Sequence, residues 1–158
     1  TSVFATIAND GVRMKPRLIG GYSNAEGSFE SSGIDKGTRV VSAQTAKTVR
    51  EMLEVVVSED GTARNLAIPG YRVGGKTGTA NRYDQESGGY SGYTSSFVGM
   101  APIENPALVM SVSIHNPKTS TYGSVVAGPV FKDVMTYALA HLKIPPSTTK
   151  PPKLPVEW

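Results

Sequence analysis

The 158-residue sequence predicts an α+β fold in which helices cover an antiparallel sheet. Residues 107–115 alternate heavy and light side chains, which is typical of a strand with one buried face. The turn signal Asn105-Pro106 connects this strand to residues 93–101, so the two segments are predicted to form a hairpin. Residues 130–142 carry apolar side chains at helical spacing and are suited to covering the sheet.

The first half of the chain predicts two helices separated by short ribbons. Apolar residues near the N-terminus lie at helical spacing, and Asp10-Gly11 supplies a stop. Residues 12–41 alternate weakly and are interrupted by glycines, which predicts short strands and turns. Ser42 is a suitable N-cap for a second helix, which should end at 58–61 and serve packing. Its apolar face comprises Ala46, Val49, Leu53 and Val56.

The second half predicts strands, a final helix and a tail. Residues 71–80 suit an extended strand that is approached closely by another element, because β-formers alternate there with small glycines. Residues 81–92 form a polar, glycine-rich segment that fits a lid or an inert hairpin loop equally well. Pro129 should lie near the start of the final helix. The apolar stripe expected to cover the sheet comprises Val130, Val134, Ala138 and Leu142, joined by Phe131, Met135 and Leu139.

Composition excludes several classes of function. The chain is 39% hydrophobic, which suffices for one modest core, and its net charge of +3 is spread without the basic, aromatic-rich runs of a nucleic-acid surface. Cysteine is absent, so disulfides and thiolate sites are excluded. His115 and His141 have no carboxylate at ligand spacing, so no metal site is expected. No apolar stretch is long enough to span a bilayer, and no signal peptide opens the chain.

The run from Tyr71 to Ala80 fits two unrelated kinds of chemistry. Gly70, Gly75, Lys76 and Thr77 satisfy the spacing of a phosphate loop, which would make this a nucleotide-binding domain. That loop requires a buried strand before it and a helix after it, and the flanking prolines and glycines disfavour both. Lys76-Thr77-Gly78 is also the K-T-G element of serine acyl-transfer enzymes that react with penicillin.

The strand prediction assigns each residue of the K-T-G element to one face of the strand. Side chains alternate along a strand, so Thr77 and Thr79 share one face and can offer hydroxyls to an anionic substrate group. Lys76 and Gly78 share the other face, where Lys76 would supply positive potential and Gly78 would permit close packing of a helix that carries a nucleophile. A lone K-T-G tripeptide, however, is more often an ordinary solvated lysine in a strand.

Several ordered blocks give the chain a wider resemblance. From about residue 1 to about residue 146 it resembles class B penicillin-binding proteins, which are peptidoglycan D,D-transpeptidases of bacteria. The resemblance rests on blocks with matching intervening lengths. They are Phe4 to Gly11, Gly74 to Ala80, Tyr93 to Pro102, Asn105-Pro106 with Leu108 to Met110, Tyr122-Gly123 and Ala127 to Phe131.

The resemblance implies a site and a reaction. The fold would be the C-terminal portion of a transpeptidase domain like those of penicillin-binding proteins and serine beta-lactamases. Lys76 would be catalytic, and the Thr79 backbone N–H would form half of an oxyanion hole. The substrate-binding residues would be Thr77, Gly78 and Thr79, with the two threonine hydroxyls and Lys76 holding the substrate carboxylate. Tyr83 and Asp84 are secondary site candidates in the following loop. Peptidoglycan stem peptides and beta-lactams would be the ligands, and no cofactor is implied.

Two motifs of the family have no credible copy in the sequence. The S-x-N string is absent, and the one S-x-x-K string, Ser147 to Lys150, lies in a proline-rich segment that cannot present both side chains on a helix. Residues 1–144 are therefore expected to be an incomplete transpeptidase domain. The nucleophile segment would come from an N-terminal remainder of the same enzyme. Residues 145–158 are expected to be an extended, disordered tail.

The resemblance also carries expectations about location and partners. The parent enzyme would be anchored outside this chain, at the extracytoplasmic face of the cytoplasmic membrane, and would work with cell-wall synthesis proteins. Three other identities stay open: a proteolytic or recombinant piece that associates with the remainder, a non-catalytic binding scaffold, and the nucleotide-binding domain. A serine beta-lactamase is a poorer fit because the match extends well beyond K-T-G. The sequence does not distinguish a septal from a side-wall role.

Overall fold

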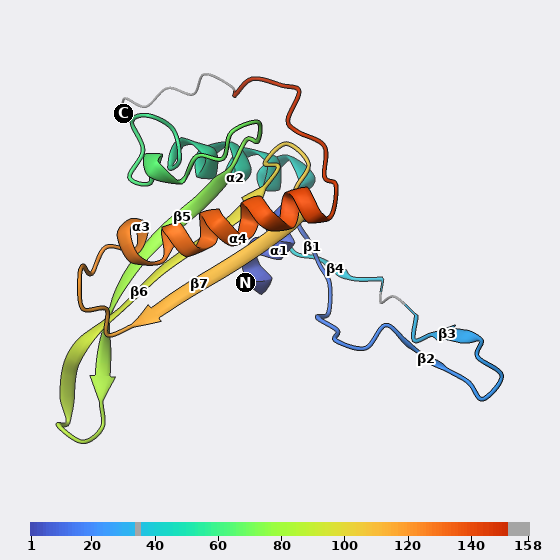
Figure 1. The fold of residues 1–158 in the computed structure, drawn as a ribbon, viewed down its shortest axis with the longest axis horizontal. Coiled ribbons are helices and arrows are strands. Elements are labelled where there is room, and N and C mark those ends of the chain that lie inside the picture. The colour runs from blue at the N-terminus through green and yellow to red at the C-terminus, as the bar shows by residue number, and fades with distance from the viewer. Residues whose placement is uncertain (34–35, 152–158) are drawn as a thin grey trace.

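A computed structural model describes residues 1–33 and 36–151, and its centre is a three-stranded antiparallel sheet. The strands are β5 (Gly74–Asp84), β6 (Gly89–Ala101) and β7 (Leu108–His115), in the spatial order β5-β6-β7. Short connections join them, as antiparallel neighbours allow (Figure 1). The predicted α+β class and the hairpin of residues 93–101 with 107–115 are confirmed.

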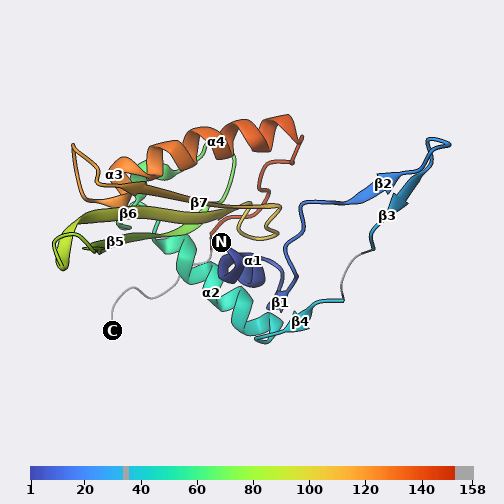
Figure 2. The same ribbon diagram turned by 90° about the horizontal axis from the view of Figure 1, so that it is seen from below.

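Helices cover both faces of this sheet. Helix α4 (Gly128–His141) lies along one face and follows directly after the short helix α3 (Gly123–Val126). Helices α1 (Ser2–Ala8) and α2 (Ala43–Val55) lie on the opposite side (Figure 2). The predicted position of Pro129 is confirmed, because it occupies the first turn of α4, where its missing N–H leaves no bond unmade.

The core lies between α4 and the sheet. Phe97 of β6 and Phe131 of α4 are fully buried and meet edge to face, with ring centroids 4.8 Å apart. Gly99, one pleat further along β6, leaves room for the Phe131 ring, because a Cβ there would lie 2.7 Å from a ring carbon. The other members of this cluster are Val57, Ala63, Leu66, Ile68, Val73, Ala101, Val112, Ala127, Met135 and Leu139.

The face of α4 that covers the sheet differs in part from the predicted stripe. Phe131, Met135 and Leu139 are buried, as expected, whereas Val130 and Val134 are 43% and 46% exposed. Leu142 is also exposed. The sequence contains two neighbouring apolar stripes about 100° apart, and periodicity alone cannot tell which of them meets the sheet.

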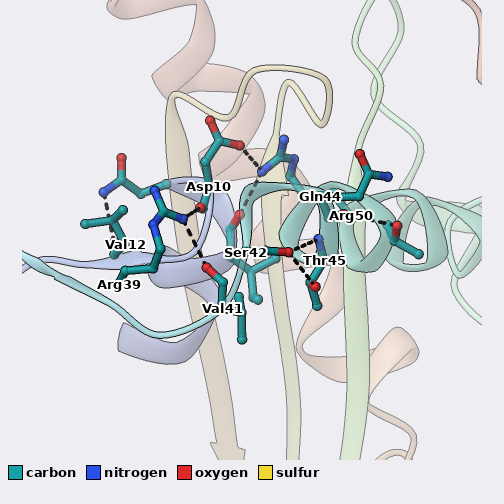
Figure 3. A network of polar contacts seen from close by, with 11 residues as sticks. Asp10, Val12, Arg39, Val41, Ser42, Gln44, Thr45 and Arg50 are labelled. Atoms are coloured by element: carbon teal, nitrogen blue, oxygen red, sulfur yellow. Dashed lines mark hydrogen bonds and ion pairs between the residues drawn. The ribbon is translucent and has the colours of Figure 1, made fainter.

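The predicted N-cap of α2 is confirmed, whereas its predicted apolar face is only partly so. Ala46 is buried, but Val49, Leu53 and Val56 are half-buried, and the other buried residues of the helix are Arg50 and Glu54. The Ser42 hydroxyl accepts a hydrogen bond from the Thr45 N–H at 3.0 Å and so caps the helix as expected. Arg50, buried on α2, donates to the Ile7 carbonyl at 2.8 Å and to the Asp10 carboxylate at 2.9 Å (Figure 3). These two bonds fix the end of α1 to α2.

Residues 12–33 and 36–41 form an arm that projects from the rest of the molecule (Figures 1 and 2). Its strands pair in two short ribbons, as the sequence predicted. Strand β1 (Val12–Arg13) pairs with β4 (Thr38–Arg39), and β2 (Gly21–Ser23) pairs with β3 (Phe29–Ser31). Arg39 holds the base of the arm by donating to the carbonyls of Asp10 and Val41 (Figure 3).

The β5–β6 hairpin is longer than predicted. Residues 81–84 and 89–92 continue the two strands, so the expected loop over 81–92 shrinks to a tight turn at 85–88. The register shifts between Asn81 and Tyr83, which accommodates an irregularity in the pairing. The polar composition that suggested a loop instead reflects two strands whose faces are largely exposed to solvent.

The helices of the described residues are short. None of the helices in residues 1–33 and 36–151 combines the length and the apolar character needed to cross a membrane.

Candidate active-site strand

Strand β5 carries the K-T-G element, and one of its edges is open. Its pairing partner is β6, and the described residues place no strand along its other edge. Gly75, Lys76 and Thr77 therefore lie inside a strand and do not open a helix. A phosphate loop cannot form in this conformation, so the nucleotide-binding interpretation of Gly70 to Thr77 is wrong.

The register shows which backbone groups of β5 face that open edge. The Asn116 N–H donates to the Tyr93 carbonyl at 2.8 Å, so the backbone groups of Tyr93 point away from β5. Backbone groups of successive strand residues point to alternate sides. Ser96 and Val98 therefore have theirs directed toward β5.

Ser96 and Val98 lie opposite Gly78 and Lys76, respectively. Gly78 and Lys76 accordingly pair with β6, and the N–H and C=O groups of Thr77 and Thr79 point to the open edge. The Thr79 N–H is thus placed where a group approaching the edge of the sheet could accept its hydrogen bond.

Lys76, Thr77 and Thr79 also make side-chain contacts. The Lys76 ammonium donates to the Thr77 carbonyl at 3.0 Å and lies 3.4 Å from the Thr77 hydroxyl. The Thr79 hydroxyl donates to the Thr121 carbonyl at 3.0 Å, just before α3. Lys76 and Thr79 are exposed and Thr77 and Gly78 are half-buried, so a ligand could reach all four residues.

The carbonyl of Thr121 receives a second hydrogen bond, from the buried Ser95 hydroxyl at 2.6 Å. Thr79 and Ser95 are direct cross-strand partners, so this single carbonyl ties β5 and β6 to the segment before α3. No motif in the sequence pointed to Thr121, because the contact uses its backbone and joins residues that are 42 positions apart.

Gly78 and Gly123 permit close packing beside the K-T-G element. A Cβ at Gly78 would lie 2.6 Å from the Ser96 hydroxyl oxygen, and a Cβ at Gly123 would press on the carbonyls of Ser96 and Gly78. Gly123 is therefore needed for α3 to approach the two strands. Within the described residues, the neighbour that limits space at Gly78 is Ser96, whereas the sequence suggested an incoming helix.

Tyr83 and Asp84 lie at the far end of β5. They follow Thr79 by four and five residues, which corresponds to roughly 13 to 17 Å along a strand. Tyr83 packs edge to face against Tyr90 at 5.9 Å, and the Asp84 carboxylate accepts from the Glu86 N–H at 3.0 Å. Both residues help to line a surface pocket at the hairpin end, and neither contacts the K-T-G residues.

A largely buried ion pair lies just before β5. The Arg72 guanidinium forms a two-pronged ion pair with Glu54 of α2, with N–O distances of 2.8 and 2.6 Å. Arg50–Asp10 is the other ion pair among the described residues, so Lys76 belongs to neither pair. The hydrogen bond that Arg72 donates to the Glu54 carboxylate raises the pKa of Arg72 above its ordinary value, and burial opposes that rise.

The two histidines are separated from this strand's K-T-G element. His115 shares a hydrogen bond of 2.9 Å with the Thr94 hydroxyl, and His141 stacks on Tyr137. Residues 1–33 and 36–151 contain no group of three or more histidine or carboxylate side chains arranged to hold a metal ion.

Comparison with known proteins gives a consistent result. A family model described as the penicillin-binding protein transpeptidase domain matches residues 1–136. The chain is 36% identical to penicillin-binding protein PbpB of Mycobacterium tuberculosis over 98% of its length, which is 24% of that relative. It is 42% identical to a probable peptidoglycan D,D-transpeptidase, PenA of Neisseria flavescens, over 78% of its length and 31% of the relative.

Solved structures agree with the sequence matches. A crystal structure of penicillin-binding protein 3 from M. tuberculosis, complexed with ampicillin, superposes with a TM-score of 0.85 at 35% identity. The superposition covers 96% of this chain and 36% of that one. The chain thus spans about a quarter to a third of the length of the relatives it matches.

Proposed function

Because the chain belongs to the penicillin-binding protein transpeptidase family, we propose that it is the C-terminal part of a peptidoglycan D,D-transpeptidase domain. The observation that carries this proposal is the K-T-G element on the open edge of β5. The serine nucleophile, in S-x-x-K, and the S-x-N segment would come from the remainder of the parent enzyme.

In the proposed reaction, that serine attacks the penultimate D-alanine carbonyl of a stem peptide. D-Alanine leaves, and an amine of a neighbouring stem accepts the acyl group. The edge-facing N–H of Thr79 would donate to the oxygen that becomes negative in the tetrahedral intermediate, together with the serine N–H. One such donor lowers the barrier by roughly 3 kcal/mol.

The side chains of β5 would bind the other end of the substrate. The Thr77 and Thr79 hydroxyls and the Lys76 ammonium lie at one edge, where they would hold the terminal carboxylate. Thr79 can turn its hydroxyl from the Thr121 carbonyl to the carboxylate, since a hydroxyl rotates freely. Gly78 has no side chain, so it would leave room for the reacting carbonyl to approach the strand.

Beta-lactams would acylate the same serine, because they present a carboxylate and a reactive carbonyl at similar spacing. Support comes from the penicillin-binding protein 3 of M. tuberculosis, whose crystal structures include complexes with ampicillin and aztreonam. We further propose that the parent acts at the extracytoplasmic face of the cytoplasmic membrane, through an anchor outside this chain, beside other cell-wall synthesis proteins.

Acylation of the parent enzyme by a fluorescent penicillin tests the proposal. Lys76→Ala should slow acylation about a hundredfold, because it removes positive charge beside the nucleophile. Thr79→Val should slow it about tenfold, since it removes a hydroxyl and keeps the backbone donor. Thr119→Val, at an exposed threonine outside β5, is the matched control and should leave the rate unchanged.

Wild-type rates for both site variants would refute the site assignment. A parent enzyme that penicillin does not label would instead favour the non-catalytic scaffold. The 158-residue chain by itself should remain unlabelled, and labelling at Ser147 would overturn the placement of the nucleophile outside this chain.

A further inference from the structure

Residues 144–149 bind residues 70–72, shortly before β5, and act as a strap across them. The Tyr71 hydroxyl donates to the Ile144 carbonyl at 2.7 Å, and the Ser147 N–H donates to the Gly70 carbonyl at 2.9 Å. The Arg72 N–H donates to the Ser147 hydroxyl at 2.9 Å. Residues 145–149, which were expected to belong to an extended, disordered tail, are thus held by hydrogen bonds, and residues 152–158 of that tail lie outside the described part of the chain.

The side chain of Arg72 joins the strap to α2. Its Nη1 donates to the Thr149 hydroxyl at 2.8 Å, while Nε and Nη2 hold both carboxylate oxygens of Glu54. The side chains of Arg72 and Glu54 are only 13% and 9% exposed, so solvent screens their attraction little. A guanidinium can bind a carboxylate with two nitrogens and a hydroxyl with the third, which a lysine ammonium cannot do in this flat geometry.

The backbone of Arg72 is held on its other side as well. Its carbonyl accepts the Ile103 N–H at 2.8 Å, from the loop that follows β6. Arg72 is thus fixed by α2, by the strap and by the loop after β6. Lys76 is four residues further along the chain, and Val73 between them is buried in the core.

We infer that Arg72 is a positioning residue for the K-T-G strand and that residues 144–149 are the strap that holds it. This inference rests on the proposed function. Lys76 and Thr77 lie on an edge strand, so within the described residues β5 has a strand partner on one side only. The position of β5 is therefore set by its hydrogen bonds to β6 and by the contacts that hold Arg72, just before the strand begins. A shift of about 1 Å at a reacting group can cost up to a hundredfold in rate.

The S-x-x-K string at Ser147 to Lys150 therefore has a structural role. Ser147 uses its hydroxyl to accept the Arg72 N–H, and the string is not helical, so it has no helical face that would bring Lys150 beside it. Pro145 and Pro146 restrict the backbone before it to extended conformations, which reduces the entropy lost when the strap binds.

The strap can be tested by changing one hydroxyl at a time in the parent enzyme. Thr149→Val removes the acceptor of Arg72 with little change in shape, and Thr149→Ser restores a hydroxyl. Thr148→Val is the matched control, because Thr148 is exposed and the described residues give its side chain no hydrogen bond. The readouts are penicillin acylation per folded molecule, thermal unfolding, and hydrogen exchange at the Lys76 and Gly78 amides.

The threonine variants are expected to differ in acylation rate and in hydrogen exchange. Thr149→Val should slow acylation about fivefold and speed exchange at Lys76 and Gly78, with Thr149→Ser and Thr148→Val close to wild type. Arg72→Lys should slow acylation to a similar extent as Thr149→Val, because an ammonium keeps the charge but cannot bind both Glu54 oxygens and the Thr149 hydroxyl in the same geometry. If an Arg72 variant fails to fold, the Thr149 series carries the test.

Two outcomes would overturn the inference. Equal acylation in Thr149→Val and Thr148→Val would show that the strap does not position the strand, even if the parent reacts with penicillin normally. Slower acylation that is fully explained by a larger unfolded fraction would show that Arg72 contributes to stability alone. Failure of wild-type parent to react with penicillin is a separate result, which refutes the proposed function and this inference with it.

Discussion

The body of the molecule and the arm of residues 12–33 and 36–41 both contain antiparallel strands but differ in what those strands touch. In the body, β6 lies between two other strands and under α4, and Phe97 is fully buried. In the arm, β2 and β3 pair only with each other, and Tyr22 and Phe29 are 65% and 66% exposed. A two-stranded ribbon has no second layer against which to bury a side chain.

The comparison shows that an aromatic residue in a strand predicts burial only where another layer is present. Phe29 and Phe97 are both strand phenylalanines, and only Phe97 has a helix above it. The contribution of a residue to stability should therefore fall from the α4 layer, through α2, to the arm. Four substitutions test this gradient, from the largest effect to the smallest.

Phe131→Ala should have the largest effect, a loss of about 4 kcal/mol in the free energy of unfolding. The change leaves a cavity against Phe97 and beside Gly99, where the surrounding strands cannot close in. Urea unfolding followed by circular dichroism measures it. A loss below 1 kcal/mol would mean that α4 is not the layer that supports the sheet.

Glu54→Gln should cost roughly 2 kcal/mol, because it leaves the guanidinium of Arg72 without a charged partner. The folded pKa of Arg72 is raised, so its contribution is fully present below the ordinary arginine pKa and is lost only as pH rises through the higher folded value. The difference between Glu54→Gln and wild type should therefore persist from about pH 7 to about pH 10. A difference that vanishes in that window would contradict the assignment.

Ser42→Ala should cost about 1 kcal/mol by removing the N-cap of α2, at the junction between arm and body. Ser42→Asp is the matched variant, because a carboxylate can accept the same N–H and should recover most of the loss. Thermal unfolding of the three proteins measures the difference. Equal midpoints for serine and alanine would show that the cap contributes nothing here.

Phe29→Ala in the arm should change the free energy of unfolding by less than about 0.5 kcal/mol. Its ring lies against Gly21 of the partner strand and is otherwise exposed to solvent. The same urea titration compares it directly with Phe131→Ala. A loss as large as that of Phe131→Ala would erase the distinction between arm and body.

Local patterns in the sequence sufficed for most of the elements. The cap at Ser42, the position of Pro129 and the alternation in β7 depend on neighbours in the chain, and each is confirmed. The 81–92 segment was misassigned because glycine and polar residues are common both in loops and in exposed hairpins. The K-T-G strand was predicted, and its chemical roles stay proposals.

The sequence by itself determined most of the elements, the K-T-G strand and the family, because propensity, capping and motif spacing are local properties of the chain. The tertiary structure alone decided three things: the open edge of β5, the stripe of α4 that meets the sheet, and the contact of Arg72 with Glu54, Ser147 and Thr149. Each depends on residues brought together from distant positions, 18 to 77 apart for Arg72. Nothing in a local pattern records which distant partner will supply the missing hydrogen bond or the covering side chain.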